Sequence, residues 1–170
     1  LGEITQNPTG WTGKLYQKFI RRGFSRGKYF ISVSQKTQKD LHRFLLSKPL
    51  LSEVVYNGLN ASFSPGNPQD ARDVLGQKTN LPLTLGYILH VGGNQWYKNR
   101  AGIIELYDSW RSGGGKSIPL LLIGEPPTPQ LVALKSRSLF KSQIHFLSDI
   151  DDSLVKVAYN GAVVFLFPSL

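Results

Sequence analysis

The sequence predicts an α/β protein built on parallel β-sheet, with a sheet in its second half and the end of another domain before it. In the second half, short apolar runs alternate with helical segments, and the connections between them are short. The runs are unbroken and rich in branched residues, as in strands that are buried on both faces. A polar stretch with several proline and glycine residues, 59–68, separates the two halves.

The first half is expected to contain two helices and two strands. In order, they are a helix over 14–22, a strand over 29–33, a helix over 35–46 and a strand over 53–56. Gly23 and Gly27 are expected to end the first helix. Ser34 is a good N-cap for the second helix, and Pro49 ends it.

The second half is expected to contain four helices and four strands in strict alternation after a first helix. The helices are predicted over 69–76, 98–111, 128–138 and 151–160, and the strands over 87–91, 118–123, 143–147 and 163–167. Short crossovers of this kind are right-handed and produce a parallel sheet. The last strand, Val163–Phe167, is expected to be buried. Pro168 and Ser169 then leave the carboxyl edge of the sheet, where open α/β folds bind ligands.

The composition favours an anionic partner. Twenty Lys and Arg face eleven Asp and Glu, which gives a net charge of +9, and there is no cysteine for a disulfide or a thiolate metal site. Much of the charge is early, in Lys14, Lys18, Arg21, Arg22, Arg26 and Lys28. A solvated basic face explains it without nucleic acid, since no aromatic-interleaved groove or zinc-finger spacing is present. Contact with an anionic membrane stays open.

The loop Gly92–Tyr97 is the best candidate for chemistry. It lies between a strand end and a helix start, where two glycines let a ligand approach the backbone and free amides favour phosphate. Lys98 could supply a positive charge, and Trp96 and Tyr97 could stack on a base. Taken alone, the same residues also fit a simple turn followed by a solvated lysine.

The other polar residues predict no catalytic group and no metal site. The three histidines lack metal spacing, and His90 and His145 lie inside apolar strands, where core histidines are common. Asp149, Asp151 and Asp152 are explained as helix-capping residues. No nucleophile elbow occurs.

Six segments taken together carry a family resemblance. They are Phe30–Ser34, Val54–Pro65, Ile88–Asn99, Leu120–Gly124, Ile144–Ser148 and Leu154–Leu170. In this order they resemble the GT4-type retaining glycosyltransferases, which have the GT-B fold of two Rossmann-like domains around a cleft. The resemblance implies that 1–58 is the C-terminal part of the acceptor-side domain, 59–86 an interdomain linker with a short helix, and 87–170 the first half of the nucleotide-sugar donor-binding domain. The chain, which has no methionine, is thus expected to be an internal piece of a longer protein.

The resemblance also assigns site residues. Gly92, Gly93, Asn94 and Lys98 would bind the donor diphosphate, and Gly124, Leu147, Ser148 and Asp149 would border the nucleotide. Basic residues that many members carry are replaced by Gly93 and Tyr97 here, so half of the usual cationic pair is missing. Arg100 is a candidate substitute.

The implied function is transfer of a hexose from a nucleoside diphosphate sugar with retention, in glycan or polysaccharide biosynthesis. The partners would be the nucleotide-sugar donor and a glycan or lipid-linked acceptor, with no cofactor and no metal, in the cytoplasm or peripheral to the inner face of the membrane. The piece alone is expected to be inactive, because the family's E-x7-E stretch would follow Leu170. The alternative is a noncatalytic Rossmann-like module that binds a phosphorylated ligand or nucleic acid through its basic face.

Overall fold

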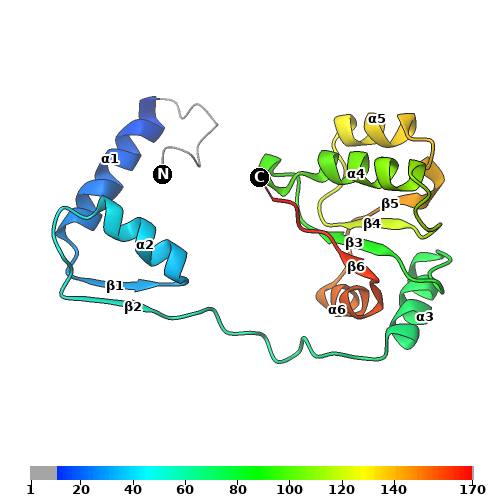
Figure 1. Cartoon of the computed structure of the whole chain (residues 1–170), viewed down its shortest axis with the longest axis horizontal. Helices are drawn as coiled ribbons and strands as arrows, with labels where there is room; N and C mark the ends of the chain where they lie inside the picture. The colour runs from blue at the N-terminus through cyan, green and yellow to red at the C-terminus, as the bar shows by residue number, and fades with distance from the viewer. Residues whose placement is uncertain (1–10, 170) are drawn as a thin grey trace. The chain divides into compact units, whose positions relative to one another are not determined.

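The computed structural model describes residues 11–169, and the chain divides into two compact units, Leu1–Asn60 and Ala61–Leu170. The boundary lies inside the proline- and glycine-containing stretch 59–68. Each unit has its own parallel sheet, as Figure 1 shows. Residues 1–10 of the predicted first domain, and Leu170, lie outside the described residues.

The first unit consists of two helices and a two-stranded sheet. Its elements are α1 (Trp11–Arg26), β1 (Tyr29–Ser32), α2 (Gln35–Phe44) and β2 (Leu51–Val54). The strands β1 and β2 are parallel and are joined through α2. Ser34 caps α2 as predicted, because its side chain accepts a hydrogen bond from the Thr37 amide.

Two elements of the first unit, α1 and β2, differ most from their predicted bounds, while β1 and α2 end one and two residues early. The helix α1 continues through Gly23, whose surroundings are open, and the chain turns at Gly27, whose amide donates to the Phe24 carbonyl. The strand β2 begins earlier than residue 53, because the amides of Leu50 and Leu51 both donate to the Lys28 carbonyl. Both differences reflect backbone pairing that residue preferences do not reveal.

The described part of the first unit has no buried hydrophobic side chain, and Ser32 is its one buried residue. The helix α1 carries five Lys or Arg residues and no acidic residue, and its Trp11 is 78% exposed. Within residues 11–169, no helix combines the length and apolar character that crossing a membrane requires.

The second unit alternates strands and helices as predicted. Its elements are α3 (Pro68–Thr79), β3 (Ile88–Val91), the 3-10 turn η1 (Trp96–Lys98), α4 (Arg100–Ser112), β4 (Leu120–Ile123), α5 (Pro129–Arg137), the 3-10 turn η2 (Lys141–Gln143), β5 (Ile144–Leu147), α6 (Asp152–Gly161) and β6 (Val164–Phe165). The four strands are all parallel, in the order β5-β4-β3-β6. This confirms the predicted α/β class.

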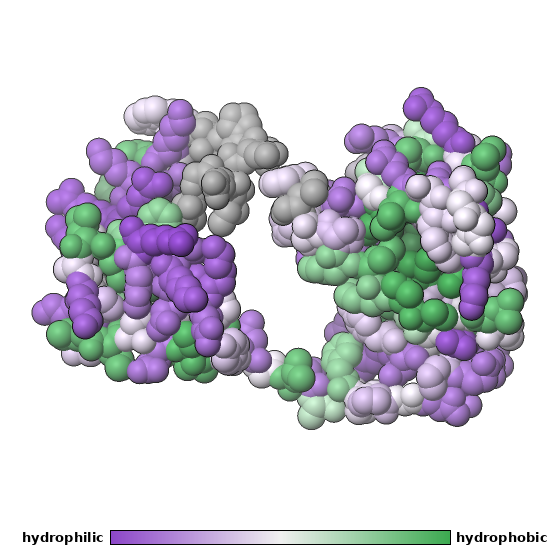
Figure 2. Space-filling model, viewed as in Figure 1, coloured by the Kyte–Doolittle hydropathy of each residue, from purple (hydrophilic) through white to green (hydrophobic). Residues whose placement is uncertain are grey.

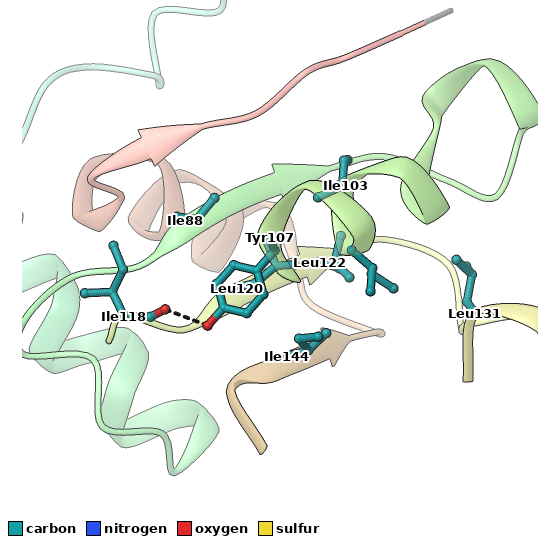
Figure 3. Packing of buried hydrophobic residues seen from close by; sticks show 9 residues of the cluster. Ile88, Ile103, Tyr107, Ile118, Leu120, Leu122, Leu131 and Ile144 are labelled. Carbon is teal, nitrogen blue, oxygen red and sulfur yellow. Dashed lines mark hydrogen bonds between the residues drawn. The ribbon is translucent and has the colours of Figure 1, made fainter. Parts of the chain in front are cut away.

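Helices cover both faces of this sheet (Figure 1). One cluster, with members from β3, β4, β5, α4 and α5, consists of Ile88, Ile103, Ile104, Tyr107, Ile118, Leu120, Leu122, Leu131 and Ile144. The Tyr107 hydroxyl donates to the Ile118 carbonyl at 2.9 Å, as Figure 3 shows. On the opposite face, a second cluster includes Leu121 and Ile123 of the same strand β4. The two-residue period of β4 therefore supplies both cores.

The predicted connection 59–86 includes a helix that packs on the second unit. The helix α3 lies against α6 and is longer than the predicted 69–76, since Asn67 caps its start and Asn80, with φ 54°, ends it. Leu75 and Leu83 are fully buried in the second cluster. This segment thus contributes to the core of the second unit.

The prediction of a buried final strand over Val163–Phe167 is wrong. The strand β6 contains only Val164 and Phe165, which pair with Ile88 and Leu89 of β3, and it has no neighbour on its other side within the described residues. Val163, Val164, Phe165 and Phe167 are 42–52% exposed. Figure 2 shows hydrophobic residues on the visible face of the second unit where this segment lies. An edge strand can have the composition of a central strand and still be exposed.

Tyr87 provides a test of the packing between β3 and α6. Its ring is fully buried and its hydroxyl donates to the Ala158 carbonyl at 2.7 Å. We expect Tyr87→Phe to lower the free energy of unfolding by about 0.5–1.5 kcal/mol, because it removes a buried hydrogen bond. Urea denaturation followed by circular dichroism measures the change. Tyr159→Phe is the matched control on α6, since no residue within 11–169 forms a hydrogen bond with that hydroxyl and Tyr159 is 38% exposed. Equal effects of the two substitutions would contradict a stabilising role of the hydrogen bond from Tyr87 to Ala158.

Candidate functional site

Three strand ends of the second unit meet at one edge of the sheet. The Gly92 amide, just after β3, donates to the carbonyl of Ile123 at the end of β4 over 2.9 Å. The Gly124 amide donates to the carbonyl of Leu147 at the end of β5 over 3.1 Å. Gly92, Gly124 and Leu147 come from separate segments, and these two bonds bring them together at the carboxyl edge.

Gly124 is required where it stands. Its φ of +142° is one that residues with a side chain rarely adopt, and a Cβ there would lie 2.2 Å from the Gly92 carbonyl oxygen. The backbones after β3 and β4 can therefore approach each other only because position 124 has no side chain.

Lys98 lies in the turn η1 and not in the helix α4, which begins two residues after the predicted start. Asn99, with φ 54°, separates them and caps α4, because its side chain accepts a hydrogen bond from the Gly102 amide at 3.3 Å. The Lys98 ammonium lies 4.5 Å from the centre of the Phe167 ring and 5.6 Å from that of Tyr97. These aromatic faces favour a cation at this position.

Asn94, Arg100 and Glu125 form a set of contacts between the two loops, which we call the loop clamp. The Glu125 carboxylate accepts a hydrogen bond from the backbone amide of Asn94 at 2.9 Å. One guanidinium nitrogen of Arg100 donates to the Asn94 side-chain oxygen at 2.6 Å and to the Glu125 carbonyl at 2.9 Å. The Asn94 side-chain nitrogen donates to the Pro126 carbonyl at 2.8 Å. The clamp fixes the loop after β3 to the loop after β4.

The clamp gives Arg100 a role other than an exposed phosphate ligand. Arg100 is 4% exposed, and its Nε and Nη2 atoms have no hydrogen-bond partner among the residues that the structure describes. Burial lowers the pKa of Arg100, and the nearby Glu125 opposes that shift. Arg100, the candidate substitute for the missing basic residue of the family, is therefore enclosed within the protein.

His90 is buried, as predicted, but only one of its ring nitrogens has a hydrogen-bond partner in the described part of the chain. Its Nδ1 lies 2.9 Å from the Leu166 carbonyl oxygen, whereas its Nε2 has no such partner there. Burial lowers the pKa of His90, and the positive charges of Arg100 and Lys98 lower it further. The ring is therefore neutral near pH 7.

Ser148 and Asp149 follow β5 directly, so they leave the sheet at the same edge as Gly92 and Gly124. Asp149 is exposed and has a φ of 57°. The helix cap predicted from this acidic cluster is Asp151, whose carboxylate accepts from the Leu154 amide at 2.8 Å. Asp149 is thus not used as the cap of α6.

Sequence reasoning missed the contributions of Glu125 and Phe167. Glu125 follows the strand-end glycine Gly124, and Phe167 lies next to the proline that leaves the sheet. An acidic residue or an aromatic ring just after a strand is a weak sequence signal for a binding site, but both residues lie at the carboxyl edge of the sheet. Among residues 11–169, no three His, Asp or Glu side chains gather as a group that could hold a metal ion.

Comparisons with solved structures relate this geometry to known folds. The chain aligns over 92% of its length with 42% of Anabaena HepE in complex with UDP and glucose, with a TM-score of 0.73 and 14% identity. It aligns over 94% with 43% of WaaG, a glycosyltransferase involved in lipopolysaccharide biosynthesis, with a TM-score of 0.74 and 20% identity. The chain aligns over 92% of its length with 38% of sucrose-phosphate synthase from Thermosynechococcus elongatus, with a TM-score of 0.68 and 19% identity.

No protein-family model and no curated protein matches the sequence. The chain spans about two-fifths of the length of the three similar structures. At these identities the likeness shows the fold, which is the Rossmann-like architecture of GT-B glycosyltransferases. The fold expected from the resemblance is therefore confirmed.

The contact between Gly124 and Gly92 yields a stability prediction. We expect Gly124→Ala to lower the free energy of unfolding by at least about 1–3 kcal/mol, since it combines an unfavourable φ with a backbone clash. Gly113→Ala is the control, because its φ is −81° and its nearest neighbour would be an ordinary contact at 3.5 Å. The control should stay within about 0.5 kcal/mol of the parent. Chemical denaturation measures both, and a Gly124→Ala protein of parental stability would contradict the geometry.

Proposed function

We propose that the second unit binds the donor of a glycosyltransferase, a nucleoside diphosphate sugar, and that the protein transfers the hexose with retention. The observation that carries the proposal is the edge where Gly92, Gly124 and Leu147 meet, with Lys98 beside them. A glycine-containing loop that leads into a helix N-terminus suits a diphosphate. Two similar structures, both of Anabaena HepE, are complexes with UDP and glucose and with UDP-glucose, which supports this ligand class.

Each residue of the edge has a proposed role. Gly92 and Gly93 line the diphosphate, and the Lys98 ammonium stabilises the charge that develops as the sugar leaves. Asn94 contributes by holding the loop, since its side chain and amide are engaged in the loop clamp.

The nucleotide occupies the adjoining part of the edge. Gly124 borders it, and the backbone over 147–149, with Leu147, Ser148 and Asp149, faces the base. No metal or other cofactor is needed in this proposal, because Lys98 and the amides at the start of α4 offset the phosphate charge.

We also propose a glycan or lipid-linked acceptor and a cytoplasmic location at the inner face of an anionic membrane. The helix α1 supports the membrane contact, with Lys14, Lys18, Arg21, Arg22 and Arg26, no acidic residue and exposed aromatic side chains such as Phe19. Cations beside exposed aromatic residues suit an anionic lipid surface.

Lys98 provides the direct test of the binding site. We expect the chain to bind UDP or GDP weakly and Lys98→Ala to weaken that binding about tenfold or more, as expected for loss of a charged hydrogen bond of about 1.5–3 kcal/mol. Isothermal titration calorimetry at low salt measures the affinities.

Lys116→Ala is the matched control, since it removes an exposed lysine beyond the far end of α4. Equal losses from the two substitutions would mean that net charge, and not the site, binds the nucleotide. Indifference to nucleoside diphosphates at millimolar concentration, together with salt-sensitive binding of oligonucleotides, would favour a noncatalytic basic module.

We expect no sugar transfer from these 170 residues alone. They align with about two-fifths of the similar glycosyltransferase structures, so they supply only part of such an enzyme. Incubation with radiolabelled UDP-glucose and analysis of released UDP and glycosylated products would measure turnover. Product formation above that of a heat-denatured control would contradict this expectation.

A further inference from the structure

His90 presents a buried hydrogen-bond acceptor at the candidate diphosphate site. Its side chain is 1% exposed, and its Nδ1 lies 2.9 Å from the Leu166 carbonyl oxygen. A carbonyl can only accept, so Nδ1 carries the hydrogen and donates it. In the neutral ring, Nε2 therefore holds a lone pair, and this atom has no partner within the described residues. A buried polar atom without a partner is rare and calls for an explanation.

The unpartnered Nε2 faces the loop through Gly92. A Cβ at position 92 would lie 2.8 Å from Nε2 and 3.5 Å from the Cδ atom of Lys98. Both side chains therefore lie against the side of Gly92 on which a Cβ would stand. At 2.8 Å that Cβ would clash with Nε2, so a residue larger than glycine at position 92 would displace the His90 ring.

The groups that act on the charge of His90 are cationic or neutral. Burial opposes its protonation most, the Leu166 carbonyl after β6 favours it, and Arg100 at the start of α4 and Lys98 of η1 oppose it. The Phe167 ring lies 6.4 Å from the imidazole, centre to centre. No carboxylate is among the groups that act on it. An anion bound beside Gly92 would reverse the local field and favour the charged imidazole.

We propose that His90 is a proton-linked binding residue for the diphosphate, which takes up a proton on Nε2 as the donor binds and donates a hydrogen bond to a phosphate oxygen. The proton comes from solvent, and no covalent bond forms or breaks. This inference rests on the proposed function of the loop. It supplies a second positive charge beside Lys98, where Gly93 and Tyr97 provide none and Arg100 is engaged in the loop clamp.

The sign of the linkage follows from the two states. In the free protein the pKa of His90 is lowered, and in the complex the diphosphate raises it, so binding consumes a proton. The affinity then increases as the pH falls through the range between the two pKa values. One linked proton gives at most about a tenfold gain in affinity for each pH unit.

UDP-glucose is the suitable probe, because its phosphates have no proton that titrates near neutral pH. We expect titration calorimetry in two buffers of different ionisation enthalpy to report uptake of up to one proton per ligand, and tighter binding at about pH 6 than at about pH 8. His90→Phe should keep the fold, bind more weakly and lose both the proton uptake and the pH dependence. His145→Phe is the control. Burial and Lys135 of α5 lower the pKa of that histidine, and its replacement should leave both the proton uptake and the pH dependence unchanged.

Nitrogen-15 NMR of the unaltered protein gives a second measurement that does not depend on the folding of a variant. It should show His90 as the Nδ1–H tautomer when free and doubly protonated when UDP-glucose is bound near neutral pH. Binding without proton uptake, or uptake that persists in His90→Phe, would overturn the inference and leave the proposed function intact. Absence of UDP-glucose binding at millimolar concentration would overturn both.

Discussion

The close approach of the backbones at Gly92 and Gly124 is the constraint on which the candidate site depends. The Gly92 carbonyl oxygen occupies space that a Cβ at position 124 would need, and the amides of both glycines bond to the neighbouring strand ends. This approach places the loop after β3 beside the loop after β4. Only then can Glu125 reach the Asn94 amide and Arg100 reach the Glu125 carbonyl. Arg100, the first residue of α4, takes part in these contacts, and Lys98 lies two residues before it.

The buried and exposed charges of the site have different tasks. Arg100 is desolvated, and one of its nitrogens joins two loops through the Asn94 side chain and the Glu125 backbone. A guanidinium can do this because its donors have a fixed planar arrangement. Lys98 is partly exposed and lies against aromatic rings that cannot neutralise it. The charge available to a ligand is thus the lysine, while the arginine keeps the loop in place.

Local sequence predicted most of the second unit and less of its edges. The run Leu120–Ile123 reveals a central strand, because its alternate residues enter the clusters on the two faces. The glycines at positions 92 and 124 were assigned to strand ends, which is where the structure has them. The exposure of β6 could not be predicted, since it depends on the number of strand neighbours and not on residue type. In the same way, His90 is visible as a polar residue in an apolar strand, but which of its nitrogens is bonded depends on the distant Leu166.

The segment after β6 connects an edge strand to the charged loop. The Leu166 amide donates to the Leu89 carbonyl, and the Leu166 carbonyl accepts from His90. The Pro168 carbonyl accepts from Asn99 at 3.3 Å, and the Phe167 ring lies beside the Lys98 ammonium. Within the described residues, the sheet holds this segment through β3, and Leu166 also packs against the first hydrophobic cluster. Loss of the pairing between β6 and β3 would therefore displace the contacts of His90 and Lys98 together. The geometry of the charged loop is thus coupled to the pairing of β6 with β3.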